Sequence, residues 1–203
     1  WNSYDGHTLI PFIEKTAKKF DLQKPVVIAD SGLLSDQNIE ALEEKRYEYI
    51  LGARIKNEPN AIKKAITAQA YTNGQAMVLD KQKGRRLIVQ YSDKRAAKDR
   101  YNRERGLKRL EKKVTSGRLT KANINNRGDN KYLKMEGEVI ISIDTEKFEK
   151  DSCWDGLKGY LTNTKLDNQA VFDNYKELWQ IEKAFRMSKT DLRIRPVYQD
   201  RKS

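Results

Sequence analysis

Residues 172–195 read FDNYKELWQIEKAFRMSKTDLRIR, a stretch without glycine or proline that ends just before Pro196. We therefore predict one helix over 173–195 that stops at the proline. At about 100° per residue, one arc of this helix is apolar and predicts its buried face: Leu178, Ile181, Ala184, Phe185 and Leu192. The neighbouring arc surrounds one carboxylate, Glu182, with cations and aromatic rings: Tyr175, Trp179, Arg186, Lys189 and Arg193. Such a carboxylate suits a metal ion beside a phosphodiester, and an amphipathic surface helix with ordinary charge pairs is the alternative.

A second carboxylate, Asp30, follows the apolar run VVIA at residues 26–29. Four consecutive small or β-branched apolar residues predict a parallel strand buried in the centre of a sheet. Ser35 is a suitable N-cap for a helix over 36–46, which completes a strand-loop-helix unit. Ligands bind at the carboxyl ends of such strands, so Asp30 is a candidate ligand. The alternative is a turn residue whose side chain satisfies the backbone after the strand.

The helix motif and the Asp30 segment resemble the insertion-sequence DDE transposases, in the branch named for its YREK motif. Tyr175, Glu182 and Lys189 fit the pattern Y-x-x-R-x-x-x-E-x-x-x-x-x-x-K. Leu178 occupies the arginine position of that pattern. Residues 27–35 (VIADSGLLS) are similar to V-x-A-D-x-G-x-x-S, the family segment that carries its second acid.

A third stretch, residues 154–163 (WDGLKGYLTN), is similar to the W-D-G-x-x-G-x-x-T-N segment of the same family. Its apolar residues predict a strand that leads into the Glu182 helix. Asp155 stays outside the predicted site, because the resemblance assigns it no metal role and its Asp-Gly context suits a turn. The resemblance covers essentially the whole chain, in order.

The resemblance implies a fold and a domain organisation. We expect an α/β protein with an RNase H-like mixed sheet flanked by helices. Residues 1–56 and 154–203 would form the core, and residues 57–153 a β-rich inserted subdomain that contains one basic helix.

The resemblance also implies a DNA transposase that cleaves the ends of an insertion sequence and transfers the cut strands. Asp30 and Glu182 would be catalytic metal ligands, with Tyr175 and Lys189 in support. The complete site of this family holds two Mg²⁺ ions on three carboxylates, and Mn²⁺ can substitute. Two alternatives stay open: a non-catalytic nucleic-acid-binding remnant of a transposase, and an RNase H-like nuclease without transposition.

Residues 1–9 (WNSYDGHTL) are similar to the G-N-x-x-(D/E)-G-x-T-L segment that follows the first acid in this family. We therefore expect the first catalytic aspartate to lie upstream of this chain, which would be the C-terminal portion of the catalytic domain. A chain that lacks one of three carboxylates is expected not to cleave DNA alone.

The charge predicts a polyanionic partner, because the net charge is +12 and the isoelectric point is about 9.6. Nucleic acid is the commonest such partner, and an anionic membrane surface is the weaker alternative. The resemblance implies double-stranded DNA, as transposon ends and target, bound by a homodimer. Residues 93–115 form the most basic predicted helix, and a solvated face is the alternative to phosphate contact. The predicted DNA-binding residues are Lys98, Arg105, Lys108, Lys112, Arg186, Lys189 and Arg193.

Other classes of protein are disfavoured by composition. No apolar run approaches the ~20 residues that span a bilayer, and the start has no signal-peptide pattern, so we expect no membrane partner. The cysteine content fits a reducing, cytoplasmic setting, and the resemblance implies a prokaryotic protein associated with the nucleoid. A single cysteine, Cys153, excludes an internal disulfide and any cysteine metal cluster. The chain has one histidine, His7, and this disfavours catalysis by a Ser-His or a Cys-His pair.

The remaining segments complete the expected element order. Apolar patterns predict helices over 8–20 and 61–70 and strands over 47–55, 76–80, 85–92, 132–135 and 138–144. The loop 81–84 would close a hairpin with Gly84 in the left-handed region. Residues 116–131 are polar and without periodicity, and we expect a mobile loop.

Overall fold

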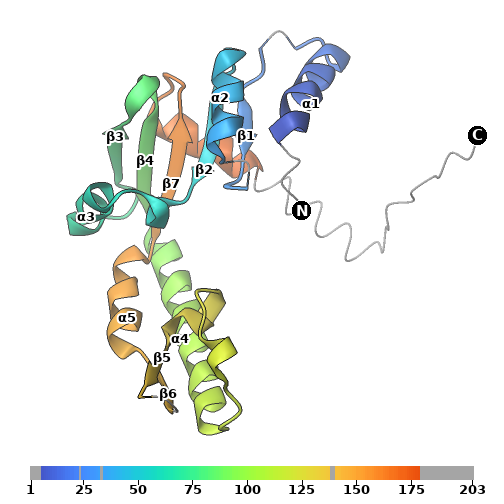
Figure 1. The fold of residues 1–203 in the computed structure, drawn as a ribbon. Coiled ribbons are helices and arrows are strands. Elements are labelled where there is room, and N and C mark those ends of the chain that lie inside the picture. The colour runs from blue at the N-terminus through green and yellow to red at the C-terminus, as the bar shows by residue number, and fades with distance from the viewer. Residues whose placement is uncertain (1–5, 23, 33, 138–139, 179–203) are drawn as a thin grey trace, which may run out of the picture. The chain divides into compact units, whose positions relative to one another are not determined.

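The computed structural model describes residues 6–22, 24–32, 34–137 and 140–178 (Figure 1). Contacts divide the chain into two compact units. The first unit comprises Trp1–Arg54, Val78–Ile88 and Tyr160–Ser203, and the second comprises Ile55–Met77 and Val89–Gly159. The predicted residues Glu182, Arg186, Lys189 and Arg193 lie outside the described residues.

The fold is mixed α/β, as predicted, and is built on a five-stranded sheet of order β1-β2-β7-β4-β3. The five strands are β1 (Val27–Ala29), β2 (Tyr49–Ala53), β3 (Ala76–Asp80), β4 (Arg86–Tyr91) and β7 (Leu157–Thr162). Each of them lies within or close to a predicted strand, because buried strands are marked by short apolar runs. The predicted pair over 76–92 is therefore confirmed as neighbouring strands of this sheet.

The position of β1 differs from the prediction. The strand is parallel to β2, as predicted, with Val27 opposite Tyr49 and Ala29 opposite Leu51. However, β1 is at one end of the described strand order, and the expectation of a central strand is wrong for the described sheet. An apolar run indicates that a strand is buried. The position of that strand in the sheet order depends instead on which distant segments pair with it.

The core of the first unit forms where two helices pack beside the paired strands β1 and β2. These helices are α1 (Gly6–Lys19) and α2 (Asp36–Glu44). The Ser35 side chain accepts a hydrogen bond from the Asn38 amide at 3.2 Å, which confirms the predicted cap of α2. The buried residues of this core are Leu9, Ile13, Ala29, Ile39, Leu42, Tyr49, Leu51 and Leu161.

The second unit contains the basic helix α4 (Asp93–Thr115), whose bounds match the prediction. Figure 1 shows it alongside the antiparallel pair β5 (Leu133–Glu136) and β6 (Ile140–Ile143), with the short helix α5 (Thr145–Lys150) close by. Their shared core is small: Leu110, Tyr132, Leu133 and Phe148. Helix α3 (Asn60–Ala68) also belongs to this unit, and it buries Ile66.

The segment 116–131 contains more regular structure than the expected loop. Two 3₁₀ helices, η3 (Lys121–Asn123) and η4 (Gly128–Tyr132), interrupt it. Thr120 and Asn123 cap the first of them reciprocally, and Tyr132 is buried at the end of the second. Polar side chains that bind the local backbone replace apolar periodicity here, which is why periodicity did not indicate the structure.

Three further short 3₁₀ helices complete the described elements: η1 (Ile55–Asn57), η2 (Gln82–Gly84) and η5 (Asp151–Trp154). In the β3–β4 connection, Gly84 has φ of +69°, as predicted for this hairpin loop. The inserted subdomain over 57–153 stays a prediction, and β3 and β4 from that range share a sheet with β1 and β2. Within the described residues, no helix is long and apolar enough to cross a membrane.

Candidate functional site

Asp30 lies directly after β1, at its carboxyl end, and its side chain is exposed. One carboxylate oxygen, Oδ1, accepts a hydrogen bond from the Gly32 amide at 2.7 Å. The interpretation of Asp30 as a turn residue is therefore confirmed. This role leaves Oδ2 without a hydrogen bond from the described part of the chain. A carboxylate can satisfy its own turn with one oxygen and still offer the other to a ligand.

The helix that carries the motif begins earlier than predicted. Its described part spans 168–178, and Asp167 Oδ1 accepts a hydrogen bond from the Ala170 amide at 2.8 Å near its start. The Asp167 side chain thus provides the N-terminal cap, a signal that the search for apolar periodicity did not use. Two aromatic side chains of this helix, Phe172 and Tyr175, pack on Tyr160 of β7, with ring centroids 5.2 and 5.1 Å away.

Tyr175 brings this helix against β2 beside the Asp30 turn. The tyrosine is 8% exposed, and its hydroxyl oxygen is 2.6 Å from where a Cβ of Gly52 would be. The Ser31 amide nitrogen lies 3.2 Å from the same point. Gly52 follows Leu51, the partner of Ala29 in the parallel register, so it is level with Asp30. The structure thus brings together Tyr175 and the Asp30 turn, two of the sequence-predicted features.

Of the two predicted metal ligands, the structure describes only Asp30. Glu182 and Lys189 lie outside the described residues, so the meeting of Asp30 with Glu182 stays a prediction. Within the described residues, no three His, Cys, Asp or Glu side chains gather in a metal-binding group. The available donor is an exposed carboxylate at a strand end, and such oxygen donors are the ligands that Mg²⁺ prefers.

Helix α4 presents the other predicted functional surface. We call its exposed cations Lys94, Lys98, Arg105, Lys108 and Lys112 the basic stripe. Successive spacings of four, seven, three and four residues place them on one side of the helix. Among the described residues, none of the five takes part in an ion pair, whereas neighbouring Arg109 pairs with Asp129 at 2.7 Å. Cations that form no ion pair within the described part of the chain are available to bind phosphate.

The opposite side of α4 packs against other parts of the second unit. Leu110 is 1% exposed, and Gly106 is buried against the Asp129 side chain. Arg103 donates to Asp155 at 2.7 Å, and both side chains are largely buried. The hydrogen bond to Asp155 holds the pKa of Arg103 above its ordinary value. The structure thus gives Asp155 an ion-pair role, which agrees with its omission from the predicted metal site.

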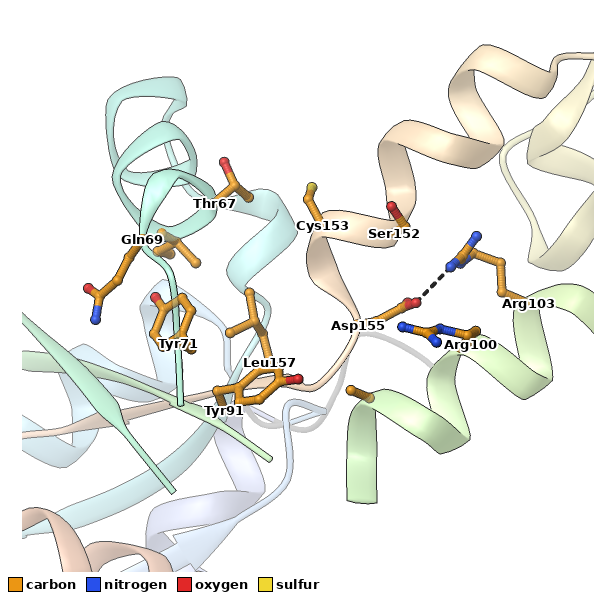
Figure 2. Close-up of a pocket in the computed structure, with 12 residues that line it drawn as sticks. Thr67, Gln69, Tyr71, Tyr91, Arg100, Arg103, Ser152, Cys153, Asp155 and Leu157 are labelled. Atoms are coloured by element: carbon orange, nitrogen blue, oxygen red, sulfur yellow. Dashed lines mark hydrogen bonds and ion pairs between the residues drawn. The ribbon is translucent and has the colours of Figure 1, made fainter. Parts of the chain in front are cut away.

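A cavity of about 360 Å³ lies within the second unit, beside this ion pair (Figure 2). Tyr71 and Tyr91 stack at one side of it, with ring centroids 6.0 Å apart and planes 21° from parallel. Arg100 and Cys153 also line the cavity. Sequence reasoning missed this cavity, because its lining comes from segments that share no local pattern.

Comparison with known protein families places the chain in one of them. The family model described as Transposase DDE domain matches residues 2–198. No curated protein and no solved structure matches the chain.

Proposed function

The chain belongs to the transposase DDE domain family, and from this membership we propose that it functions in the cleavage and transfer of the DNA ends of an insertion sequence. The family match over residues 2–198 is the observation that carries the proposal. The position of Asp30 at the carboxyl end of β1 supports it, because this is where ligands bind in open α/β sheets. The YREK branch is part of the proposal and rests on Tyr175, Glu182 and Lys189.

In the proposed site, Asp30 and Glu182 bind divalent metal, with Mg²⁺ as the expected ion. Two such ions, when bound, activate the attacking oxygen and stabilise the leaving oxygen in an in-line displacement at phosphorus. The Gly32 amide orients the Asp30 carboxylate through Oδ1 and leaves Oδ2 for the metal. Tyr175 is a positioning residue, since it seats its helix against β2. Lys189 binds a DNA phosphate.

DNA is the proposed partner of the basic stripe, together with Arg186 and Arg193. The exposed, unpaired cations of α4 support this assignment, because they can replace counterions on a phosphate backbone. The proposed assembly is a homodimer, which would bring two transposon ends to one complex.

Metal binding by this chain tests the site without requiring cleavage. Mn²⁺ is the probe, and its binding is followed by electron paramagnetic resonance. We expect Asp30→Asn and Glu182→Gln each to weaken binding by at least about 10-fold. Asp36→Asn is the matched control, since Asp36 is an exposed carboxylate close in sequence to Asp30. Equal binding by all variants, or equal loss in all three, would overturn the assignment.

Catalysis is tested with the protein encoded by the whole gene, on a plasmid that carries the ends of the element. Metal-dependent cleavage and strand transfer that require Asp30 would support the transposase. DNA binding without cleavage would favour the non-catalytic remnant, and cleavage without strand transfer would favour the nuclease.

A further inference from the structure

One aromatic side chain, Tyr101, interrupts the basic stripe at its middle. It lies three residues after Lys98 and four residues before Arg105, which places it in line with the five cations. Tyr101 is 61% exposed, whereas four other tyrosines of the chain are buried: Tyr49, Tyr132, Tyr160 and Tyr175. The Arg105 guanidinium lies 5.8 Å from the ring centroid. The stripe therefore combines cations with one open aromatic face.

Two acidic residues of α4, Glu104 and Glu111, border this surface, and Glu111 lines a hollow together with Lys108 and Lys112. At about 100° per residue, Glu104 and Glu111 lie roughly 90° from the line of the stripe. Asp99 is engaged elsewhere, since it pairs with Arg95 at 3.4 Å and accepts a hydrogen bond from the Gly156 amide at 3.2 Å. The stripe runs for ~27 Å from Lys94 to Lys112, at 1.5 Å per residue. That length spans several nucleotides.

To a duplex, an exposed tyrosine offers its hydroxyl as a hydrogen-bond donor to phosphate, and its ring finds no base to stack on. Each base inside a duplex is covered on both faces by its neighbours, so phosphate contact would be served better by another lysine at this position. An unpaired base has an open face, and stacking on an aromatic side chain contributes about 1–3 kcal/mol per base. Combined cationic and aromatic surfaces are the general solution for single-stranded nucleic acid.

We infer that the basic stripe binds single-stranded DNA, with the phosphates on its cations and one base stacked on Tyr101. The inference rests on the proposed function for its partner, DNA, and adds the form of that DNA. To the duplex that the cations of the stripe bind, it adds an unpaired strand, such as one exposed when a DNA end is opened. Arg105 contributes twice, through its contact with the ring and through a phosphate.

The test compares three substitutions on two probes, a 12-nucleotide single strand and a 20-base-pair duplex, by fluorescence anisotropy. We expect Tyr101→Ala to weaken binding of the single strand by about 5- to 100-fold, which corresponds to the stacking of one base. Duplex binding should change by less than about twofold, because the cations remain. Tyr101→Phe should retain single-strand binding, since the ring is kept. Asn102→Ala, at the next exposed position, is the control and should change neither affinity.

A second readout reports stacking directly. A single strand with 2-aminopurine should lose fluorescence on binding to the unchanged protein and to Tyr101→Phe, and keep it on binding to Tyr101→Ala. Single-strand affinity that is unaffected by Tyr101→Ala, or that falls in parallel with duplex affinity, overturns the inference. Duplex binding without any single-strand binding overturns it too, and leaves the proposed function standing. Failure of the unchanged protein to bind either probe counts instead against the proposed DNA partner.

Discussion

At the scale of single residues, Gly52 shows why a glycine occupies a buried strand. The Tyr175 hydroxyl and the Ser31 amide nitrogen take the space that any Cβ at this position would need. Strand β2 is otherwise apolar and buried, so the glycine is explained by the approach of another element. The close contact couples β2 to the helix that carries Tyr175.

We expect Gly52→Ala to lower the free energy of unfolding by about 1–3 kcal/mol, because the added methyl group overpacks this contact. The same substitution in a Tyr175→Phe background should cost less, since the clashing hydroxyl is gone. Urea unfolding of the two single variants and the double variant measures this coupling. An identical cost in both backgrounds would contradict the contact.

Sequence reasoning at this scale succeeded where a residue acts locally. The Ser35 cap and the alternative of a turn for Asp30 were both predictable, because each bond spans only two or three residues. The approach of Tyr175 to Gly52 was not predictable, because it joins residues more than a hundred positions apart. Glu182 was identified from a motif, and its place in the structure stays a prediction.

At the scale of elements, one ion pair ties α2 to the start of β4. Arg85 donates two hydrogen bonds to the Glu43 carboxylate, at 2.6 and 2.8 Å. The Tyr49 hydroxyl donates to the same carboxylate at 2.9 Å. The bond from Arg85 is the largest cause that holds the pKa of Glu43 below its ordinary 4.5, against the opposing effect of burial. The carboxylate is therefore more stable as an anion in the folded state.

The lowered pKa predicts how stability depends on pH. The contribution of Glu43 is fully present above its ordinary pKa of 4.5 and is lost as pH falls through its lower folded value. We expect Glu43→Gln to cost about 2 kcal/mol at pH 7, as a charged hydrogen bond is removed. Thermal unfolding should show the difference in stability between the unchanged protein and Glu43→Gln becoming smaller as the pH approaches 3. Glu44→Gln, at an exposed position on the same helix, is the control, and a gap independent of pH would contradict the ion pair.

At the scale of elements, the helices and strands with long or clearly periodic sequence patterns were the ones predicted correctly. The 23-residue helix α4 and the strands β3 and β4 were predicted to within about one residue, because their patterns are long or clearly apolar. The six-residue helix α5 was missed, since a helix so short carries little periodic signal. Its cap, Asp144, accepts from the Lys147 amide at 2.9 Å and was the available indication.

At the scale of the whole molecule, the net charge of +12 predicts a steep dependence of duplex binding on salt. We expect the joint replacement of Lys98, Arg105, Lys108 and Lys112 by Gln to reduce the slope of log affinity against log salt by about 3 to 4. The control removes the same charge from exposed positions in and after α1 and should leave the slope nearly unchanged: Lys15, Lys18, Lys19 and Lys24. Equal slopes for the unchanged protein and the α4 variant would mean that the stripe is a solvated face without phosphate contacts.

The order of the sheet was beyond sequence reasoning. Apolar runs indicate which segments are strands, but β2 pairs with β7 across more than a hundred residues. Neither the place of β1 at one end of the described order nor the division into two units has a local signal. The motifs indicated the family, and the pairings of the strands required the structure.

The hydrogen bond from the Gly32 amide to Asp30 also bears on how an insertion sequence of the proposed kind would lose its activity. An amide oxygen also accepts that bond, so Asp30→Asn keeps the turn while it removes the negative charge. If the proposed site is right, this single codon change yields a folded protein that still occupies DNA ends and cuts nothing. In a host genome, the protein from such a copy would compete with the active protein for the DNA ends of every copy. One inactivated copy would therefore repress the remaining active copies, besides losing its own activity.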